Sequence, residues 1–235
     1  AVPMQVVQPP PTACLPGLQL PDLEEANGAL VLTALLDWGA AAVGQLHASP
    51  AAAAVGRIRG TGPGASIGRL IARLHGDCPI SIEAPFEGSA RVAGGVWDTR
   101  AWTGIARADA LVRLEFAAGA LDLPMHAHPE SDRLLLVIGG RGYFHVTPQP
   151  LEGFDGTRVR TIPVRDRDAV LFRGGVVHTF SADSEPLTLL SYHAPFIPLE
   201  STRQYALPAA RWTASQHLHR TQGCVALDPA WSVLA

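Results

Sequence analysis

The sequence predicts a mainly β protein, an antiparallel β-sandwich or barrel preceded by a helical region. From about Cys78 to Pro198, short apolar or alternating runs are separated by turn signals such as Gly139-Gly140 and Gly174-Gly175. No segment of helical length interrupts these runs. Before them, from Asp22 to about His75, apolar residues recur at the three- and four-residue spacing of helices.

Each apolar run is a predicted strand of this barrel, and turn residues bound it. The runs are ALVRLEF (110–116), RLLLVIG (133–139), GYFHV (142–146), VRTIPV (159–164), AVLF (169–172), VVHTFS (176–181) and LTLLSYH (187–193).

The chain of 235 residues, 47% of them hydrophobic, is long enough for one main domain with extensions. Six prolines in residues 1–21 predict an extended arm. Residues 22–76 form the helical region, residues 77–200 the barrel, and residues 201–235 a tail. Within the tail, Trp212 and Trp231 are the expected anchors that pack it against the barrel.

Three helices are expected in the helical region. The first is DLEEANGALVLTALLDWGAAAVGQL (22–46), which has acids in its first turn. The second is SPAAAAVGRI (49–58), where a serine cap precedes a proline at the first helical position. The third is SIGRLIARLHG (66–76), which ends at a glycine. Four acids and four arginines balance in this region, so we do not expect it to bind DNA.

Overall charge and cysteine content indicate small-molecule partners. The formal charge of −3 provides no broad basic field for nucleic acid or an anionic membrane. The chain has no lysine, which excludes a lysine Schiff base and a Walker-type phosphate loop. Cys14, Cys78 and Cys224 form no CxxC pair, and no secretion signal or membrane span is recognisable, so we expect a cytoplasmic protein.

The stretch MHAHPESDR (125–133) carries the chemistry that the sequence suggests. In a strand, His126 and His128 project from the same face with their backbones roughly 6.5 to 7 Å apart, and their imidazoles can converge on one ion. A third ligand must then come from another strand. His178, in RGGVVHTFS (173–181), follows a glycine turn and is a suitable candidate.

At these residues the chain resembles the cupin family. GALDLPMHAHPESDRLLLVIGG (119–140) resembles the first cupin motif, with Gly119, His126, His128, Asp132 and Gly139 at its motif positions. RDAVLFRGGVVH (167–178) resembles the second motif, with Gly175 and His178 in register. The resemblance covers about residues 96 to 198.

Several residues depart from the motifs. Asp132 replaces the usual glutamate, and Glu130 lies two residues earlier, so that either acid can complete the site. In the second motif, Arg173 stands in place of the usual proline. Arg167 and Ala182 are also unusual at their positions.

The resemblance implies a jelly-roll barrel, or double-stranded β-helix, that holds one divalent ion through three histidines and one acid. These ligands suit Fe, Mn, Ni, Cu or Zn and leave positions open for a substrate, water or O₂. Arg113 and Arg133 flank the site in sequence and can orient a carboxylate. The candidate residues that line a substrate pocket are Phe144, His145, Phe172, Phe180, Tyr192, His193 and Arg113.

The sequence leaves the function open between three readings. The first is an oxygenase, isomerase or lyase that acts on a small molecule at the metal. The second is a non-catalytic protein that binds or senses a small ligand, and the third is a structural barrel. The barrel edges and the proline-rich arm suggest a homodimer.

Two further motifs have less support. GASIG (64–68) fits the nucleophile elbow of a serine hydrolase at Ser66, but no buried strand leads into it and no alternating β/α pattern follows. His217 and His219 repeat the His-x-His pattern without a partner acid, and we interpret them as solvent-exposed.

Overall fold

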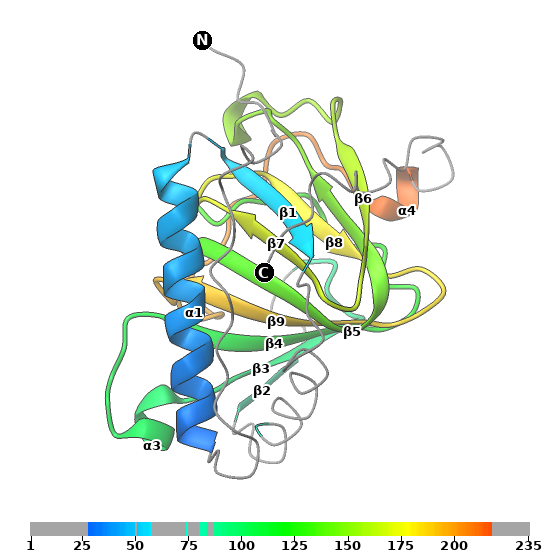
Figure 1. The fold of residues 1–235 in the computed structure, drawn as a ribbon. Coiled ribbons are helices and arrows are strands. Elements are labelled where there is room, and N and C mark those ends of the chain that lie inside the picture. Colours follow the sequence, from blue (N-terminus) through cyan, green and yellow to red (C-terminus); the bar gives the residue numbers. More distant parts are fainter. Residues whose placement is uncertain (1–27, 50, 58–73, 75–79, 84–86, 218–235) are drawn as a thin grey trace.

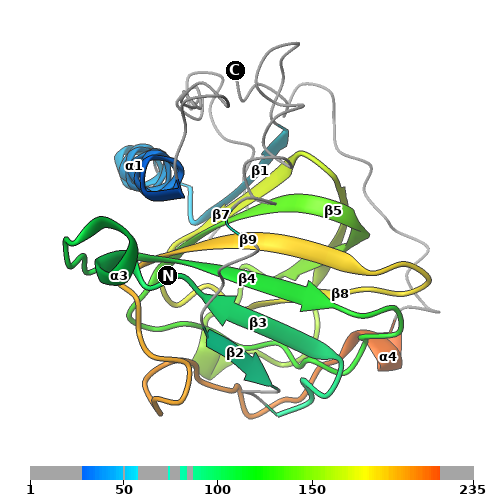
Figure 2. The ribbon, with the colours of Figure 1, turned by 90° about the horizontal axis from the view of Figure 1, so that it is seen from below.

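The computed structural model describes residues 28–49, 51–57, 74, 80–83 and 87–217. Their strands form one antiparallel sheet in the order β1-β7-β5-β9-β4-β3-β2, and β6 and β8 also pair with β5. Figures 1 and 2 show this sheet curving into a barrel with helix α1 along its outside. The predicted fold class, a mainly β barrel with a helical amino-terminal extension, is confirmed.

Most helices and strands are short, and α1 and β5 are the longest. The helices are α1 (Gly28–Ala48), α3 (Thr99–Thr103), α4 (Ala214–His217) and the 3-10 turn Leu151–Gly153. The strands are β1 (Ala53–Arg57), β2 (Ile80–Glu83), β3 (Val92–Val96), β4 (Ala110–Phe116), β5 (Asp132–Val146), β6 (Arg160–Arg165), β7 (Asp168–Phe172), β8 (His178–Ser181) and β9 (Leu187–Ala194).

Strand β5 joins the two parts of the barrel. Its first half pairs with β7 and β9, and its second half pairs with β6 and β8. The pairing with β9 shifts register between Val137 and Gly139, at a bulge where the strand bends. Gly140 has φ 68°, and a Cβ there would lie 1.8 Å from the carbonyl oxygen of Pro186. The glycine pair therefore bends one strand, whereas the sequence suggested a break between two.

The central strands are buried on both faces. Along β5, Leu134 and Leu136 pack in a cluster with α1, while Leu135 and Val137 pack in the barrel interior. Strands β7 and β9 alternate in the same way. Two-sided burial explains why their sequences are nearly continuous apolar runs.

Helix α1 confirms the first predicted helix over residues 28–46; residues 22–27 lie outside the described residues. By length and composition α1 could cross a membrane, with a mean hydropathy of 1.5. In this structure one face packs on the barrel instead, and its buried residues recur at three- and four-residue spacing. They are Val31, Leu32, Leu35, Leu36, Trp38, Gly39, Ala42, Val43 and Leu46.

The second predicted helix, over 49–58, is wrong: residues 53–57 form strand β1, paired with β7. The alanines favour a helix locally, but tertiary pairing overrides a weak propensity. Val55 packs in the barrel interior, and Arg57 Nε donates to the buried Asp168 carboxylate across the pair at 2.9 Å. The third predicted helix, over 66–76, lies outside the described residues except for Leu74.

Arg173, which departs from the cupin motif, holds the carboxyl end of α1. Its guanidinium donates to the carbonyl oxygens of Leu46 at 3.1 Å and His47 at 3.4 Å, and to that of Ser49. The last carbonyls of a helix have no partner within the helix, so a cation there satisfies them.

The described part of the tail packs on the barrel. The backbone N–H groups of Met125 and Ser215 donate to the carbonyls of Trp212 and Leu121, at 2.9 and 3.0 Å. Trp212 is buried with Met125, as expected of an anchor. Trp231 lies outside the described residues.

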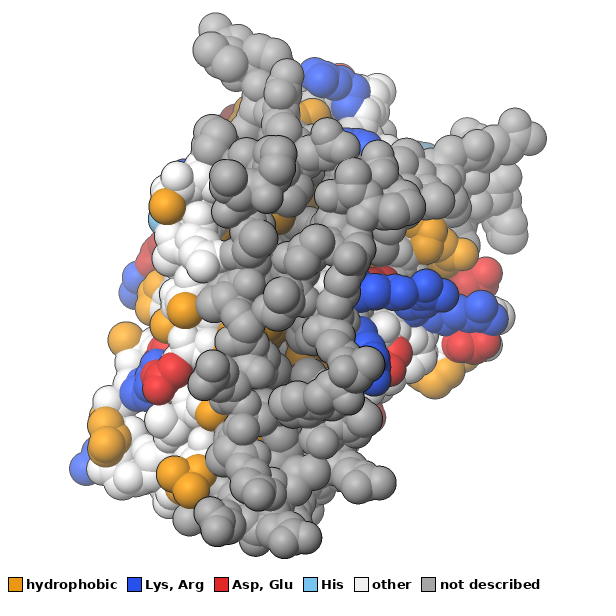
Figure 3. Space-filling model, in the orientation of Figure 1, with side chains coloured by type: hydrophobic (Ala, Val, Ile, Leu, Met, Phe, Trp, Pro, Cys, Tyr) orange, Lys and Arg blue, Asp and Glu red, His pale blue; other side chains and the backbone are white. Residues whose placement is uncertain are grey.

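Several charged side chains on the described surface form ion pairs. In Figure 3 the blue and red side chains lie in mixed groups on the face shown. Opposite charges pair at Arg107–Asp37, Arg141–Glu185, Arg203–Glu130 and Arg211–Glu87.

We expect Arg173→Ala to lower the free energy of unfolding by about 1–3 kcal/mol, because it leaves helix-end carbonyls without a charged donor. Urea denaturation measures this loss. Arg141→Ala is the matched control, since its exposed pair with Glu185 contributes only about 0–1 kcal/mol. Equal stability of the two variants would contradict the role of Arg173.

Candidate metal centre

Three histidines from two distant segments meet inside the barrel. His126 and His128 lie on the extended segment before β5, and His178 is the first residue of β8. His126 and His178 face each other in an antiparallel bridge, in which each backbone N–H donates to the carbonyl of the other, at 2.9 and 2.8 Å. This bridge joins residues that are far apart in the sequence.

The three rings form a compact, buried cluster. Their centroids are 4.7 to 5.2 Å apart, and one ligand atom from each lies within 4.8 Å of the others. His126, His128 and His178 are 7%, 8% and 2% exposed. Since a metal–imidazole bond is about 2.0–2.1 Å long, small side-chain shifts bring three such nitrogens to one ion.

Hydrogen bonds to backbone carbonyls set the orientation of each ring. The Nδ1 atoms of His126, His128 and His178 lie 2.8, 2.6 and 2.8 Å from the carbonyl oxygens of Pro124, Gln204 and Val176. A carbonyl can only accept, so each Nδ1 carries the proton and each Nε2 of the neutral ring carries the lone pair. Histidines that bind a metal usually have such a second partner.

The electrostatics of the cluster keep the rings neutral. Burial lowers the pKa of His126 to about 4 and the pKa values of His128 and His178 well below their ordinary range. The positive charge of Arg133 lowers each of these pKa values further. Neutral imidazole is the form that binds a metal ion.

The two acids that the sequence suggested as the fourth ligand are engaged elsewhere. One carboxylate oxygen of Asp132 lies 2.7 Å from His47 Nε2, and the other accepts from the backbone N–H of Gly174 at 2.8 Å. Glu130 is on the surface and pairs with Arg203. The structure therefore brings neither carboxylate into the cluster.

Arg133, one residue after Asp132, points into the barrel instead. Successive residues of a strand face opposite sides, so Asp132 faces α1 and Arg133 faces the interior. Arg133 is 2% exposed and donates to Ser131 Oγ, and to Gln204 Oε1 at 3.3 Å. An arginine thus stands beside the histidines where the motif led us to expect an acid.

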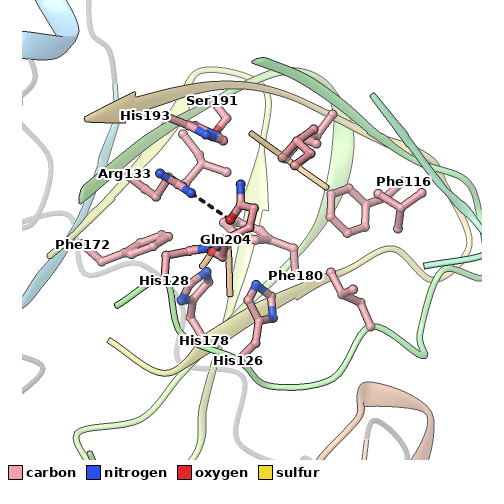
Figure 4. A pocket seen from close by; sticks show the side chains of 15 residues that line it. Phe116, His126, His128, Arg133, Phe172, His178, Phe180, Ser191, His193 and Gln204 are labelled. Carbon is pink, nitrogen blue, oxygen red and sulfur yellow. Dashed lines mark hydrogen bonds between the residues drawn. The ribbon is translucent and has the colours of Figure 1, made fainter. Parts of the chain in front are cut away.

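The histidines open onto a cavity of about 50 Å³ (Figure 4). A water molecule needs about 10–15 Å³ on such a measure, so the cavity has room for a small molecule. Arg133, Ser191, His193 and Gln204 provide its other polar groups. The remaining lining is apolar and consists of Val92, Leu114, Phe116, Leu123, Leu135, Phe172, Phe180 and Leu199.

Three of the residues predicted to contact substrate, Phe172, Phe180 and His193, line this cavity. Phe144 lies in the interior core, where its ring is 5.9 Å from Phe172 and 5.0 Å from Phe180, but it does not line the cavity.

The other predicted substrate residues face away from the cavity, and their placement corrects the sequence assignment. Tyr192 packs in the cluster with α1 and donates to Asp109, because its neighbours Ser191 and His193 take the inward positions. Arg113, next to the inward Leu114, pairs with Glu115.

His145 also faces outward. Its ring nitrogens lie 2.8 Å from Thr161 Oγ1 and 2.7 Å from Ser181 Oγ, and the ring packs against Trp212. His217 stacks on Trp212 and is half-buried rather than solvent-exposed. His219 and Ser66 lie outside the described residues.

Sequence reasoning missed several residues that line the cavity, among them Ser191, Leu199 and Gln204. Strand alternation with His193 would have indicated Ser191 once the register was known. Gln204 comes from the tail, where no local pattern signals its position. It is the most consequential of the three, because its backbone orients His128 and its side chain contacts Arg133.

Sequence comparison with protein-family models and with curated proteins finds no match. Solved structures to which the chain is similar include an oxalate decarboxylase from Lactobacillus farciminis, at 15% identity and a TM-score of 0.37, covering 55% of this chain and 33% of that one. An oxalate oxidase in complex with glycolate has 20% identity and a TM-score of 0.37, covering 46% and 53%. A cupin-2 domain from Rhodospirillum rubrum has 20% identity and a TM-score of 0.36, covering 50% and 66%.

This chain therefore spans about one third to two thirds of the length of those proteins. The observation that decides the fold comes from this structure itself. The residues that match the two cupin motifs meet at the His126–His178 bridge inside one antiparallel barrel. The protein has a cupin fold. In this cupin barrel, the first-motif and second-motif histidines form the cluster, and Arg133 takes the inward position that follows them.

We expect the metal-free cupin barrel to lose stability as the pH falls from about 6.5 toward 4. The buried histidines have folded-state pKa values below the ordinary 6.5, so the unfolded chain takes up more protons in this range. Their contribution is complete above the unfolded pKa and is lost as the pH falls toward the folded one. Each histidine contributes a slope of up to about 1.4 kcal/mol per pH unit.

Urea denaturation of the metal-free protein across this pH range measures the slope. His145→Gln isolates one histidine outside the metal cluster, whose pKa burial lowers to about 3. We expect a shallower pH dependence in this variant. An unchanged slope would contradict the assignment of His145 as a neutral buried ring.

Proposed function

We propose that this cupin barrel binds one divalent transition metal through His126, His128 and His178. We further propose that it acts as a metalloenzyme on a small organic molecule held in the adjoining cavity. An oxygenase, an isomerase or a lyase fits this site. Fe, Mn, Ni, Cu and Zn all accept imidazole ligands.

The observation that carries the proposal is the shared hydrogen-bond pattern of the three rings. Each Nδ1–H donates to a backbone carbonyl, so all three rings have the same tautomer, with the lone pair on Nε2. A group of structural histidines has no need of one common tautomer. Three lone pairs within reach of one point provide the ligand set that a metal requires.

The donor set leaves room for chemistry. Three protein ligands leave open coordination positions, and a bound metal would act there as a Lewis acid or bind O₂ or substrate directly. The apolar walls, among them Phe172 and Phe180, exclude water from this end of the cavity. Among the described lining residues there is no carboxylate, and His193 stays neutral because burial lowers its pKa well below the ordinary value.

Elemental analysis of the untagged protein tests the metal site. We expect about one equivalent of a transition metal in the wild type, and none in a His126→Ala/His178→Ala double variant, which lacks two of three ligands. The identity of the metal then selects the assay: O₂ consumption for iron, and isomerase or lyase substrates for zinc or manganese.

His193→Ala is the matched control, because His193 lines the same cavity outside the cluster. This variant should keep its metal. Circular dichroism establishes that both variants fold. Wild-type protein that takes up no metal even after reconstitution would overturn the proposal, and metal binding without any turnover would favour the ligand-binding alternative.

The cellular setting and assembly are also proposals. We propose a cytoplasmic homodimer, in which a second copy pairs with a terminal strand of the sheet order, β1 or β2. Sedimentation should then give a species of twice the chain mass. A single species of 24.8 kDa would contradict the dimer.

A further inference from the structure

We propose that the cavity binds a small organic carboxylate, whose carboxylate group Arg133 holds opposite the three histidines. This inference deepens the proposed function. Binding of the carboxylate by Arg133 needs no metal, and only the contact at the histidine end of the cavity rests on the proposed metal site. The group that recognises the ligand would be the guanidinium of Arg133, supported by His193 and Gln204.

Arg133 is a buried cation whose contacts are all neutral. It donates to Ser131 Oγ, to the backbone carbonyl of Asp132 at 3.5 Å and to Gln204 Oε1. Among the described residues it forms no ion pair, although the Asp132 carboxylate acts on it through space. A buried charge without a charged partner is costly, and an anionic ligand would supply that partner.

His193 provides a second, independent observation. It lies directly across from Arg133 in the β5–β9 pairing, and both residues line the cavity. Its Nε2 is 2.8 Å from Ser191 Oγ, but its buried Nδ1 has no hydrogen-bond partner in the described structure. Figure 4 shows Arg133 and His193 on the side of the cavity opposite His126 and His178, with Gln204 between the two sides.

The charges around the cavity also favour an anion. The three histidines are neutral, so a divalent ion bound by them would keep its full charge of two. Arg133 adds another positive charge, because burial lowers its pKa only to about 9. No carboxylate among the described lining residues balances these charges. A carboxylate ligand can approach both the metal and the guanidinium, and arginine binds carboxylates through two parallel hydrogen bonds.

The walls of the cavity favour an organic acid over an inorganic anion. Phe116, Phe172 and Phe180, together with several leucines, provide most of the lining. Phosphate or sulfate would lose hydration against these side chains without gaining apolar contacts. The cavity of about 50 Å³ restricts the ligand to a few non-hydrogen atoms.

Gln204 connects the two ends of this binding site. Its backbone carbonyl accepts from His128 Nδ1 at 2.6 Å, and its side-chain oxygen accepts from Arg133. A ligand that displaces the side-chain contact to Arg133 would leave the backbone contact to His128 in place. The anion can therefore bind without disturbing the orientation of a histidine in the cluster.

Calorimetric titration of the wild-type protein tests the inference without any mutation. Propionate is the probe, propionamide is its neutral analogue of nearly the same shape, and phosphate is the inorganic anion. Each is titrated into metal-free protein and into protein reconstituted with Zn²⁺. We expect propionate to bind at least about tenfold more tightly than either competitor, because only propionate combines a carboxylate with an apolar body.

Variants of Arg133 test whether this side chain causes the preference for propionate. Arg133→Met keeps much of the side-chain volume and removes the charge, so we expect propionate to lose its advantage over propionamide. Arg133→Lys should restore part of it, because it keeps the charge without the two-pronged geometry. Arg141→Met is the matched control, since Arg141 is exposed and pairs with Glu185. It should bind propionate like the wild type.

Three results would overturn the inference: no propionate binding in either metal state, equal binding of propionate and propionamide, or tighter binding of phosphate. Unchanged binding in a folded Arg133→Met variant would overturn it too. If that variant does not fold, the wild-type titrations decide. If the protein takes up no Zn²⁺ or other metal, only the proposed function fails, and the metal-free titration still decides this inference.

Discussion

The alternation of side chains along β5, β7 and β9 is the constraint on which the rest of the structure depends. In each strand, one set of residues packs under α1 and the other set faces the barrel interior. A register shift of one residue would place Arg133 and His193 under helix α1. It would turn the leucines that now pack against α1 toward the cavity. Because both faces are buried, this register is strongly specified. The contents of the cavity follow from it.

The two main departures from the cupin motifs have a common structural explanation. Asp132 faces outward, where it contacts His47 near the end of α1 and the backbone of Gly174. Arg173 donates to the last carbonyls of the same helix. Asp132 and Arg173 stand at motif positions that would otherwise supply a metal ligand and shape a turn. Here both residues attach α1 to the barrel. The acid is lost from the interior as a consequence.

The loss of that acid changes the electrostatics of the site. A cluster with three neutral histidines and one carboxylate would balance half of the charge of a divalent ion. Here the neighbouring inward side chain is a buried arginine, which adds positive charge and lowers further the histidine pKa values that burial already lowers. A buried positive charge without a charged partner is costly, so the proposed carboxylate ligand would also provide the counter-charge of this site.

The sequence by itself determined the fold class, the strand regions from β4 to β9 apart from the continuity of β5, and the three histidines, because these depend on local patterns: alternation, turn residues and the spacing of two motifs. Only the tertiary structure decided that 53–57 is a strand, since its partner β7 lies more than a hundred residues away. The tertiary structure was also needed to place Gln204, which reaches the cavity from the tail. The choice between Asp132 and Arg133 as the inward residue depended on strand register, which long-range burial against α1 sets and which no local pattern records.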